Sequence, residues 1–199
     1  DITKEIELHK KLLQGNSYLI VNRKNTGAMD LLINLSINEF KGLIITRGNP
    51  EQIKRQIPQS KNIEISLLTK EKIRGITNIS DLDELKQNIK TFSKNNKKSV
   101  ILLDGIHYLL SRYSFDDFIK VLYDLNDIIV KNKAIMFVRI DPSTIQESQM
   151  ALIENELLIL PSQKTEDLII EDNLFNILKY INEQNIDNAI VSVKKVMNK

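Results

Sequence analysis

The chain has 199 residues, 28 Lys and Arg against 26 Asp and Glu, and a formal net charge of +2. A chain of this length forms one domain with a short appendage, and its balanced charge argues against nucleic-acid binding through a bulk positive field. The absence of Cys excludes disulfide scaffolds, thiol catalysis and thiolate zinc sites, and two His residues are too few for a His-rich metal site, so we expect neither a metal nor a cofactor.

Short apolar runs bounded by Gly, Pro or Asp recur along the first 160 residues. Continuous runs of this kind are typical of strands that are buried on both faces of a parallel sheet. We therefore expect strands at residues 18–21, 43–45, 63–68, 100–103, 134–140 and 157–160.

Apolar residues at helical spacing alternate with these strands. Repeated strand–helix–strand units imply right-handed crossovers and a mostly parallel sheet covered on both faces, which is a three-layer α/β fold. Ligands of such sheets bind at the carboxyl ends of the strands. The apolar faces of the expected helices comprise Leu31, Leu32 and Leu35; Leu82, Leu85, Ile89 and Phe92; Phe115, Phe118, Ile119, Leu122, Leu125 and Ile129; and Ile145, Leu152 and Ile153.

The character of the sequence changes after Pro161. A polar stretch at 162–167 reads as a linker, and two amphipathic helices follow it. We expect an α/β domain at 1–161 and a linker with a helical hairpin at 162–199. Two short helices cannot bury their apolar faces on each other alone, so the hairpin is expected to dock on the sheet domain, on a second copy or on a partner. The expected partner-binding residues are Leu174, Ile177, Leu178, Ile181, Ile186, Ile190, Val193 and Met197.

No apolar run approaches the roughly 20 residues that span a bilayer. The start of the sequence carries no signal-peptide pattern. We therefore expect a soluble, cytoplasmic protein that makes no membrane contact.

The loop after the first expected strand has the position and length of a Walker A phosphate loop. Such a loop needs glycines whose amides cradle phosphate, a Lys for the β- and γ-phosphates and a hydroxyl for magnesium. Ala28 supplies no charge and Met29 no hydroxyl, so we favour an ordinary strand–helix loop. The alternative is a vestigial phosphate loop in which Arg23 or Lys24 partly replaces the lost Lys. The residues that stand where a functional loop reads Gly-Thr-Gly-Lys-Thr are Asn25, Thr26, Gly27, Ala28 and Met29.

Polar residues also stand where other expected strands end. Arg47 follows the second strand, where ATPases of this sheet type carry the carboxylate that polarises the attacking water, and an Arg cannot be that base. Asp104 ends an apolar run in a Walker B pattern. This pattern predicts either a carboxylate that holds magnesium through water or a turn residue, and we favour the turn residue. Arg139 either faces the sheet edge, pairs with Asp104 or Asp141, or touches a partner. The candidate cluster for a ligand or partner at this edge is Arg23, Arg47, Asp104, His107 and Asp141.

Four blocks together resemble the archaeal domain-of-unknown-function 835 family over about residues 8–160. They are GNSYLI at 15–20, GLIITRGNP at 42–50, LLDGIHYL at 102–109 and DP at 141–142. Members are similar to RecA/KaiC-type ATPases that have lost the phosphate loop, so the resemblance implies a RecA-like P-loop-type fold, archaeal origin and linkage to signalling or DNA-binding modules. In relatives a winged-helix-like extension sometimes follows; the tail from Leu174 is too short for one, which makes DNA binding by this chain alone doubtful.

Three functional hypotheses follow. The first is a non-catalytic RecA/KaiC-like domain, a pseudo-ATPase that acts as a protein-interaction or regulatory module in signalling or transcription; its candidate partners are a RecA-like ATPase and a second copy. The second is a weak nucleotide-binding protein or NTPase that uses Arg23, Lys24 and Arg47 for phosphate and Asp104 for magnesium. The third is nucleic-acid binding by a local basic face at Lys94, Lys97 and Lys98.

Overall fold

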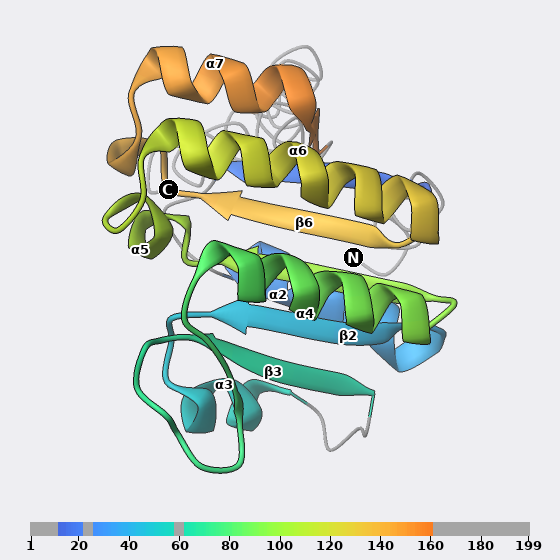
Figure 1. Ribbon diagram of the computed structural model, residues 1–199. Helices are drawn as coiled ribbons and strands as arrows, with labels where there is room; N and C mark the ends of the chain where they lie inside the picture. Colours follow the sequence, from blue (N-terminus) through green and yellow to red (C-terminus); the bar gives the residue numbers. More distant parts are fainter. Residues whose placement is uncertain (1–11, 22–25, 58–61, 161–199) are drawn as a thin grey trace, which may run out of the picture. The chain divides into compact units, whose positions relative to one another are not determined.

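A computed structural model gives the fold and describes residues 12–21, 26–57 and 62–160 (Figure 1). The chain divides into two compact units, residues 1–159 and 160–199. The expected hairpin lies outside the described residues with all eight of its candidate partner-binding side chains, and so do Arg23, Lys24 and Asn25.

Seven parallel strands form one sheet within the described residues, in the order β4-β3-β2-β5-β6-β1-β7. The predicted α/β fold with a parallel sheet is therefore confirmed. Strand β4 was not expected from the sequence, because it is short, polar and at the sheet edge. The strands are β1 (Asn16–Val21), β2 (Lys41–Thr46), β3 (Ile63–Leu68), β4 (Thr77–Ile79), β5 (Ser99–Asp104), β6 (Ile135–Ile140) and β7 (Leu158–Ile159).

Helices cover both faces of the sheet, which makes three layers. Helices α4 and α6 lie side by side on one face (Figure 1). Helix α2 packs on the other face. A Cβ on Gly42 of β2 would lie 3.1 Å from Leu32 Cδ2 of α2. The next residue, Leu43, points to the opposite face and belongs to the core under α4 and α6. The helices are α2 (Thr26–Asn38), α3 (Pro50–Gln56), α4 (Leu82–Asn95), α5 (Ile106–Leu110), α6 (Phe115–Asn132) and α7 (Glu147–Glu156), with a 3-10 turn η1 (Pro142–Thr144).

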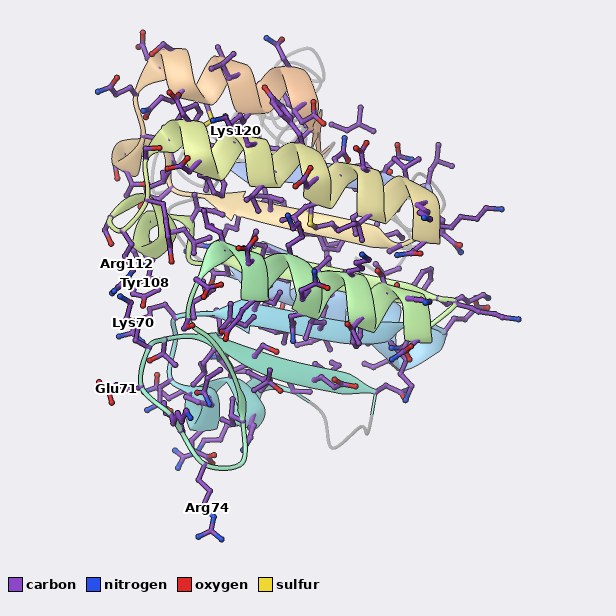
Figure 2. The ribbon with its side chains drawn as sticks, viewed as in Figure 1. Lys70, Glu71, Arg74, Tyr108, Arg112 and Lys120 are labelled. Carbon is purple, nitrogen blue, oxygen red and sulfur yellow. The ribbon has the colours of Figure 1, made fainter. Side chains whose placement is uncertain are left out.

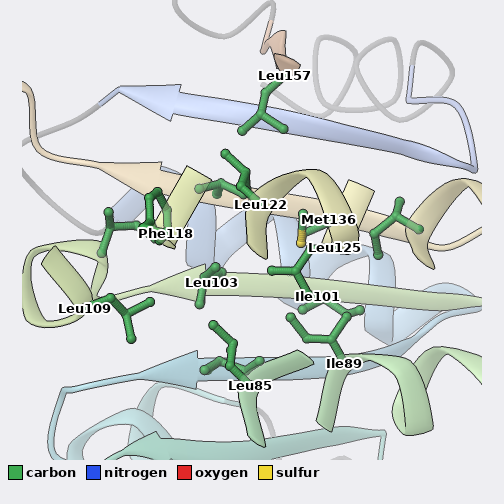
Figure 3. Packing of buried hydrophobic residues seen from close by; sticks show 14 of the residues in the cluster. Leu85, Ile89, Ile101, Leu103, Leu109, Phe118, Leu122, Leu125, Met136 and Leu157 are labelled. Atoms are coloured by element: carbon green, nitrogen blue, oxygen red, sulfur yellow. The ribbon is translucent and has the colours of Figure 1, made fainter. Parts of the chain in front are cut away.

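The two long helices on the α4–α6 face have clear sequence origins. Asp81 caps α4 by accepting a hydrogen bond from the backbone N–H of Glu84, and Ser114 caps α6 in the same way. Both helices carry apolar residues at helical spacing, and these side chains fill the space over β5 and β6 (Figure 3). The buried residues at the centre of this layer include Leu85, Ile89, Ile101, Leu103, Phe118, Leu122, Leu125 and Met136.

In the described part of the chain, no helix is long and apolar enough to cross a bilayer.

The chain leaves neighbouring strands β2 and β5 toward opposite faces of the sheet. After β2 it enters α3, which lies on the same face as α2, since Ile53 of α3 and Ile33 of α2 line one pocket. After β5 it enters α5 and then α6 on the opposite face. A reversal of this kind opens a crevice at the carboxyl ends of the strands, where open α/β sheets bind their ligands.

Candidate functional site

A pocket of about 590 Å³ occupies this crevice at the carboxyl ends of β2, β5 and β6. Its volume is within the range of small-molecule sites. One wall comes from α2 through Met29, Asp30 and Ile33, and another comes from α3. The strand ends contribute polar side chains, so the pocket combines apolar walls with charged groups at its base. The residues contributed by the strand ends and the turns after them include Thr46, Arg47, Gly48, Asp104, Gly105, His107 and Arg139.

Asp104 and Arg139 form an ion pair at the base of this pocket. They are direct neighbours in the register of β5 and β6, and alternation along the strands places both on the α2 face. Arg139 Nε donates to Asp104 Oδ1 at 2.7 Å, and Nη2 lies 2.7 Å from the same oxygen. Both side chains are largely buried, 12% exposed for Arg139 and 7% for Asp104. Of the roles that the sequence left open for Arg139, the structure therefore shows pairing with Asp104.

The ion pair determines what Asp104 offers to a ligand. A carboxylate that holds magnesium in a phosphate site presents its negative charge to the cation and its waters. Here a guanidinium already lies against Oδ1, and its charge-assisted hydrogen bonds are of the strong kind. The pair thus places a positive charge where a second cation would have to approach.

Arg47 lines the pocket, but its guanidinium is directed at the neighbouring β3 and α5. Nη1 donates to the carbonyl oxygen of Leu68 at 3.1 Å, and the guanidinium carbon lies 4.9 Å from the centre of the Tyr108 ring. The backbone after Arg47 is fixed as well, because the N–H of Gly48 donates to Thr46 Oγ1 at 3.0 Å. Arg47 therefore connects β2 to β3 and α5 at the carboxyl ends of the strands.

Gly105 makes the sharp turn between Asp104 and α5. Its φ of +126° is a conformation that L side chains rarely adopt. A Cβ at this position would lie only 2.9 Å from Leu68 Cδ1. The glycine thus lets α5 begin directly after the strand and brings the exposed His107 to the pocket.

The start of α2 is apolar at the positions that a phosphate loop needs. Ala28 and Met29 are only 2% and 4% exposed, so both side chains are packed into the protein. Thr26 and Gly27 form the first residues of the helix, and Gly27 is exposed. At the two positions where a phosphate loop carries its Lys and its hydroxyl, this segment therefore has a buried alanine and a methionine that lines the pocket.

The structure brings together three of the five residues in the candidate strand-end cluster. Arg47, Asp104 and His107 all line the pocket. Asp141 does not line it; its carboxylate accepts hydrogen bonds from the N–H and the hydroxyl of Ser143 at 2.9 and 2.7 Å and caps η1. The fifth residue, Arg23, lies outside the described residues.

The basic face proposed for nucleic acid lies at the amino ends of the strands, away from the pocket. Lys94 is exposed in the last turn of α4, and Lys97 and Lys98 are exposed in the turn that leads into β5. Lys98 forms an ion pair with Glu39. A carboxylate therefore offsets part of the positive charge of this face.

Sequence reasoning missed Tyr108 and Arg112 as members of the strand-end region. The Arg112 guanidinium carbon lies 5.3 Å from the centre of the Tyr108 ring (Figure 2). The guanidinium groups of Arg47 and Arg112 therefore both contact this ring. The spacing of Tyr108 and Arg112, four residues apart around a short helix, was a signal in the sequence. The contact between Tyr108 and Arg47 had no signal in the sequence, because it depends on β2 and β5 being neighbours.

Fold and site together define an open, parallel α/β protein with a polar pocket at the carboxyl ends of its strands. The family model described as "Protein of unknown function (DUF835)" matches residues 12–157, and the chain belongs to this family. No curated protein matches the sequence. The chain is similar to a crystal structure described as a KaiC-like protein, PH0186, from the hyperthermophilic archaea Pyrococcus horikoshii OT3. The sequence identity is 17% and the TM-score 0.47, over 64% of this chain and 63% of that chain, less than two thirds of its length.

Proposed function

We propose that this chain is a non-catalytic RecA/KaiC-like domain that acts as a protein-interaction or regulatory module. The observation that carries the proposal is the buried ion pair between Asp104 and Arg139 at the base of the pocket. In a phosphoryl-transfer site the corresponding carboxylate serves a magnesium ion, and catalysis depends on the charge of that ion. Here the carboxylate serves an arginine of the neighbouring strand.

Two further features of the pocket support the same proposal. The start of α2 presents Met29 to the pocket and buries Ala28, so the charge and hydroxyl of a phosphate loop have no counterpart at these positions. Arg47 stands at the end of β2, where a water-activating carboxylate would be needed. Loss of one preorganised polar group typically reduces turnover by about 100- to 1000-fold, and here three are replaced together.

An assay of phosphate release from ATP and magnesium tests the absence of catalysis. We expect the chain and its Asp104→Asn variant to give the same background rate, because the carboxylate has no part in the reaction. Asp104→Asn is the matched substitution, since it removes the charge and keeps the shape of the side chain. Turnover that is present in the chain and lost in a folded Asp104→Asn variant would refute the proposal.

Weak nucleotide binding is the second candidate function, and the pocket itself favours it. A volume of about 590 Å³ at the carboxyl ends of parallel strands is where nucleotides bind in this class of sheet. Arg47 and His107 line this pocket, and the Arg47 guanidinium would meet a phosphate by turning from Leu68 and Tyr108 toward the pocket. Binding without hydrolysis is compatible with a regulatory role, whereas turnover is not part of the proposal.

The proposed docking element for a partner is the hairpin at 162–199, which lies outside the described residues. Its apolar positions repeat at helical spacing, and a partner protein or a second copy would cover them. Truncation before Leu168 tests this point. The proposal requires that partner binding or self-association is lost in the truncated chain, and full retention of both would exclude the hairpin as the docking element.

A further inference from the structure

We propose that the edge of the sheet beside the pocket binds an acidic polypeptide segment of a partner protein. The surface consists of Arg47, Lys70 and Arg112 with Tyr108 among them, and we name it the strand-end basic surface. The inference rests on the proposed role as an interaction module and specifies the chemistry of the partner. It concerns a surface of residues 47–112 and is independent of the hairpin.

The centre of the surface is the Tyr108 ring, which holds two guanidinium groups in place. Arg47 lies 4.9 Å and Arg112 5.3 Å from the ring centre. Arg47 is fixed further by its hydrogen bond to the carbonyl of Leu68. A guanidinium stacked on an aromatic ring keeps N–H groups at its edge, and this fork matches a carboxylate. Both side chains are thereby preorganised, which lowers the entropy cost of binding.

Lys70 adds a third cation from a different loop. Lys70 and Arg112 line a common depression of about 400 Å³ together with Ser111 and Tyr113. Lys70, Tyr108 and Arg112 lie close together at one edge of the molecule in Figure 2, and Arg74 extends farther out from the same loop as Lys70. The loop also carries Glu71, the acidic neighbour of this surface.

Carboxylates compensate some basic residues of the domain, and the three neighbouring cations of this surface are not among those residues. Lys54, Lys86, Lys98 and Arg139 each pair with a carboxylate. Among the described residues, no carboxylate lies within ion-pair distance of Arg47, Lys70 or Arg112. All three are exposed, so the surface presents uncompensated positive charge to solvent and would attract a negatively charged partner.

The observations favour an acidic protein segment over a nucleic acid. The chain has a net charge of only +2, so it lacks the broad positive field that nucleic-acid binding uses. Two cations already engage the Tyr108 ring, which leaves it less suited to stacking a base. Glu71 would repel a continuous phosphate backbone along the loop, whereas a peptide presents its carboxylates at separate positions.

Fluorescence anisotropy with a labelled oligo-glutamate peptide tests the inference. We expect binding that weakens as salt is added, because exposed charges are screened. Arg112→Gln should weaken binding by about fivefold, the upper range for an exposed ion pair. Lys120→Gln is the matched control, because it makes the same charge change at an exposed position on α6 (Figure 2), and it should leave binding unchanged.

A second variant separates preorganisation from charge. Tyr108→Leu keeps the net charge and removes the aromatic platform, and it should weaken binding in a chain whose circular dichroism shows an intact fold. Equal effects of Arg112→Gln and Lys120→Gln, or no binding of the peptide, would overturn the inference. Tighter binding of a labelled DNA duplex through Arg112 would overturn it in favour of a nucleic acid. None of these outcomes depends on ATP hydrolysis, so failure of the inference is distinguishable from failure of the proposed function.

Discussion

Gly105 joins the pocket to the strand-end basic surface, and its backbone conformation makes a specific prediction. Gly75 is the matched control, since its φ is also positive, at +82°, but nothing lies within 4 Å of a Cβ built on it. We expect Gly75→Ala to lower the free energy of unfolding by about 1–2 kcal/mol, the left-handed backbone penalty. Gly105→Ala adds a collision with Leu68 Cδ1 and should cost more. Urea unfolding measures both; equal losses would show that Leu68 moves aside freely.

The buried pair at the base of the pocket makes a prediction about stability. Arg139→Met leaves the carboxylate of Asp104 without its cation, and we expect a loss of about 3–5 kcal/mol in the free energy of unfolding. The double variant Asp104→Leu with Arg139→Met should recover a large part of this loss, because it leaves no buried charge. Denaturant unfolding of Arg139→Met, of Asp104→Leu and of the double variant completes a double-mutant cycle. Additive losses would contradict the coupling of the two side chains.

Tyr113 supplies a prediction for the alkaline range. Burial raises the pKa of the Tyr113 hydroxyl above the ordinary value of 10.0, and the negative charge of Asp81 raises it further. The folded protein therefore holds this proton at a pH where the unfolded chain loses it. The resulting stability is complete below pH 10 and is lost as the pH rises through the raised pKa. The alkaline loss of unfolding free energy should be smaller in Tyr113→Phe, and an identical loss would contradict the assignment.

The sequence predicted individual pocket residues better than their partners. Arg47, Asp104 and His107 follow apolar strands, and the carboxyl ends of parallel strands meet at one edge, so their convergence was predictable. The pair between Asp104 and Arg139 was left open, because it depends on which strands are neighbours and on their register over 35 residues. Asp141 was grouped with the cluster, but local hydrogen bonds to Ser143 hold its side chain at η1.

At the scale of elements, the layer formed by α4 and α6 over β5 is expected to dominate the stability of the domain. Leu125 of α6 is fully buried in this layer, while Val130 of the same helix is 57% exposed. Leu125→Ala should lower the free energy of unfolding by about 2–5 kcal/mol, through lost burial and the cavity that remains. Val130→Ala is the control on the solvent side and should change it by less than about 0.5 kcal/mol. Chemical denaturation measures both, and similar losses would contradict the assigned faces.

Elements with a strong apolar pattern were predictable, and weakly patterned ones were not. The apolar run at 100–103 lies within β5, and the residues at helical spacing from Phe115 to Ile129 lie on α6. Strand β4 (Thr77–Ile79) was not predicted, because only Ile79 is buried and the strand therefore has no apolar pattern. Its extended conformation depends on pairing with β3. The expected strand at 157–160 is reduced to two paired residues at the sheet edge.

At the scale of the whole molecule, the strand order decides what the pocket contains. Strand β6 lies between β1 and β5, so it brings Arg139 to the side of Asp104 and separates this carboxylate from the strand that leads into α2. Strand order is set by contacts between distant segments, and the sequence therefore predicted a parallel sheet without its order. The central claim, that Asp104 serves Arg139 rather than the metal of a nucleotide, is the proposal that rests on β5 and β6 being neighbours.

Thermal unfolding of the full chain with and without ATP and magnesium tests this claim most directly. A ligand present at about 100 times its dissociation constant stabilises a protein by about 2.7 kcal/mol, so binding would raise the melting temperature clearly. We predict that ATP and magnesium change the melting temperature of the chain and of its Asp104→Ala variant by the same amount, because Asp104 serves Arg139 and not a metal. A nucleotide-dependent rise in the chain that Asp104→Ala abolishes would contradict it and would make the strand-end pocket a working nucleotide site.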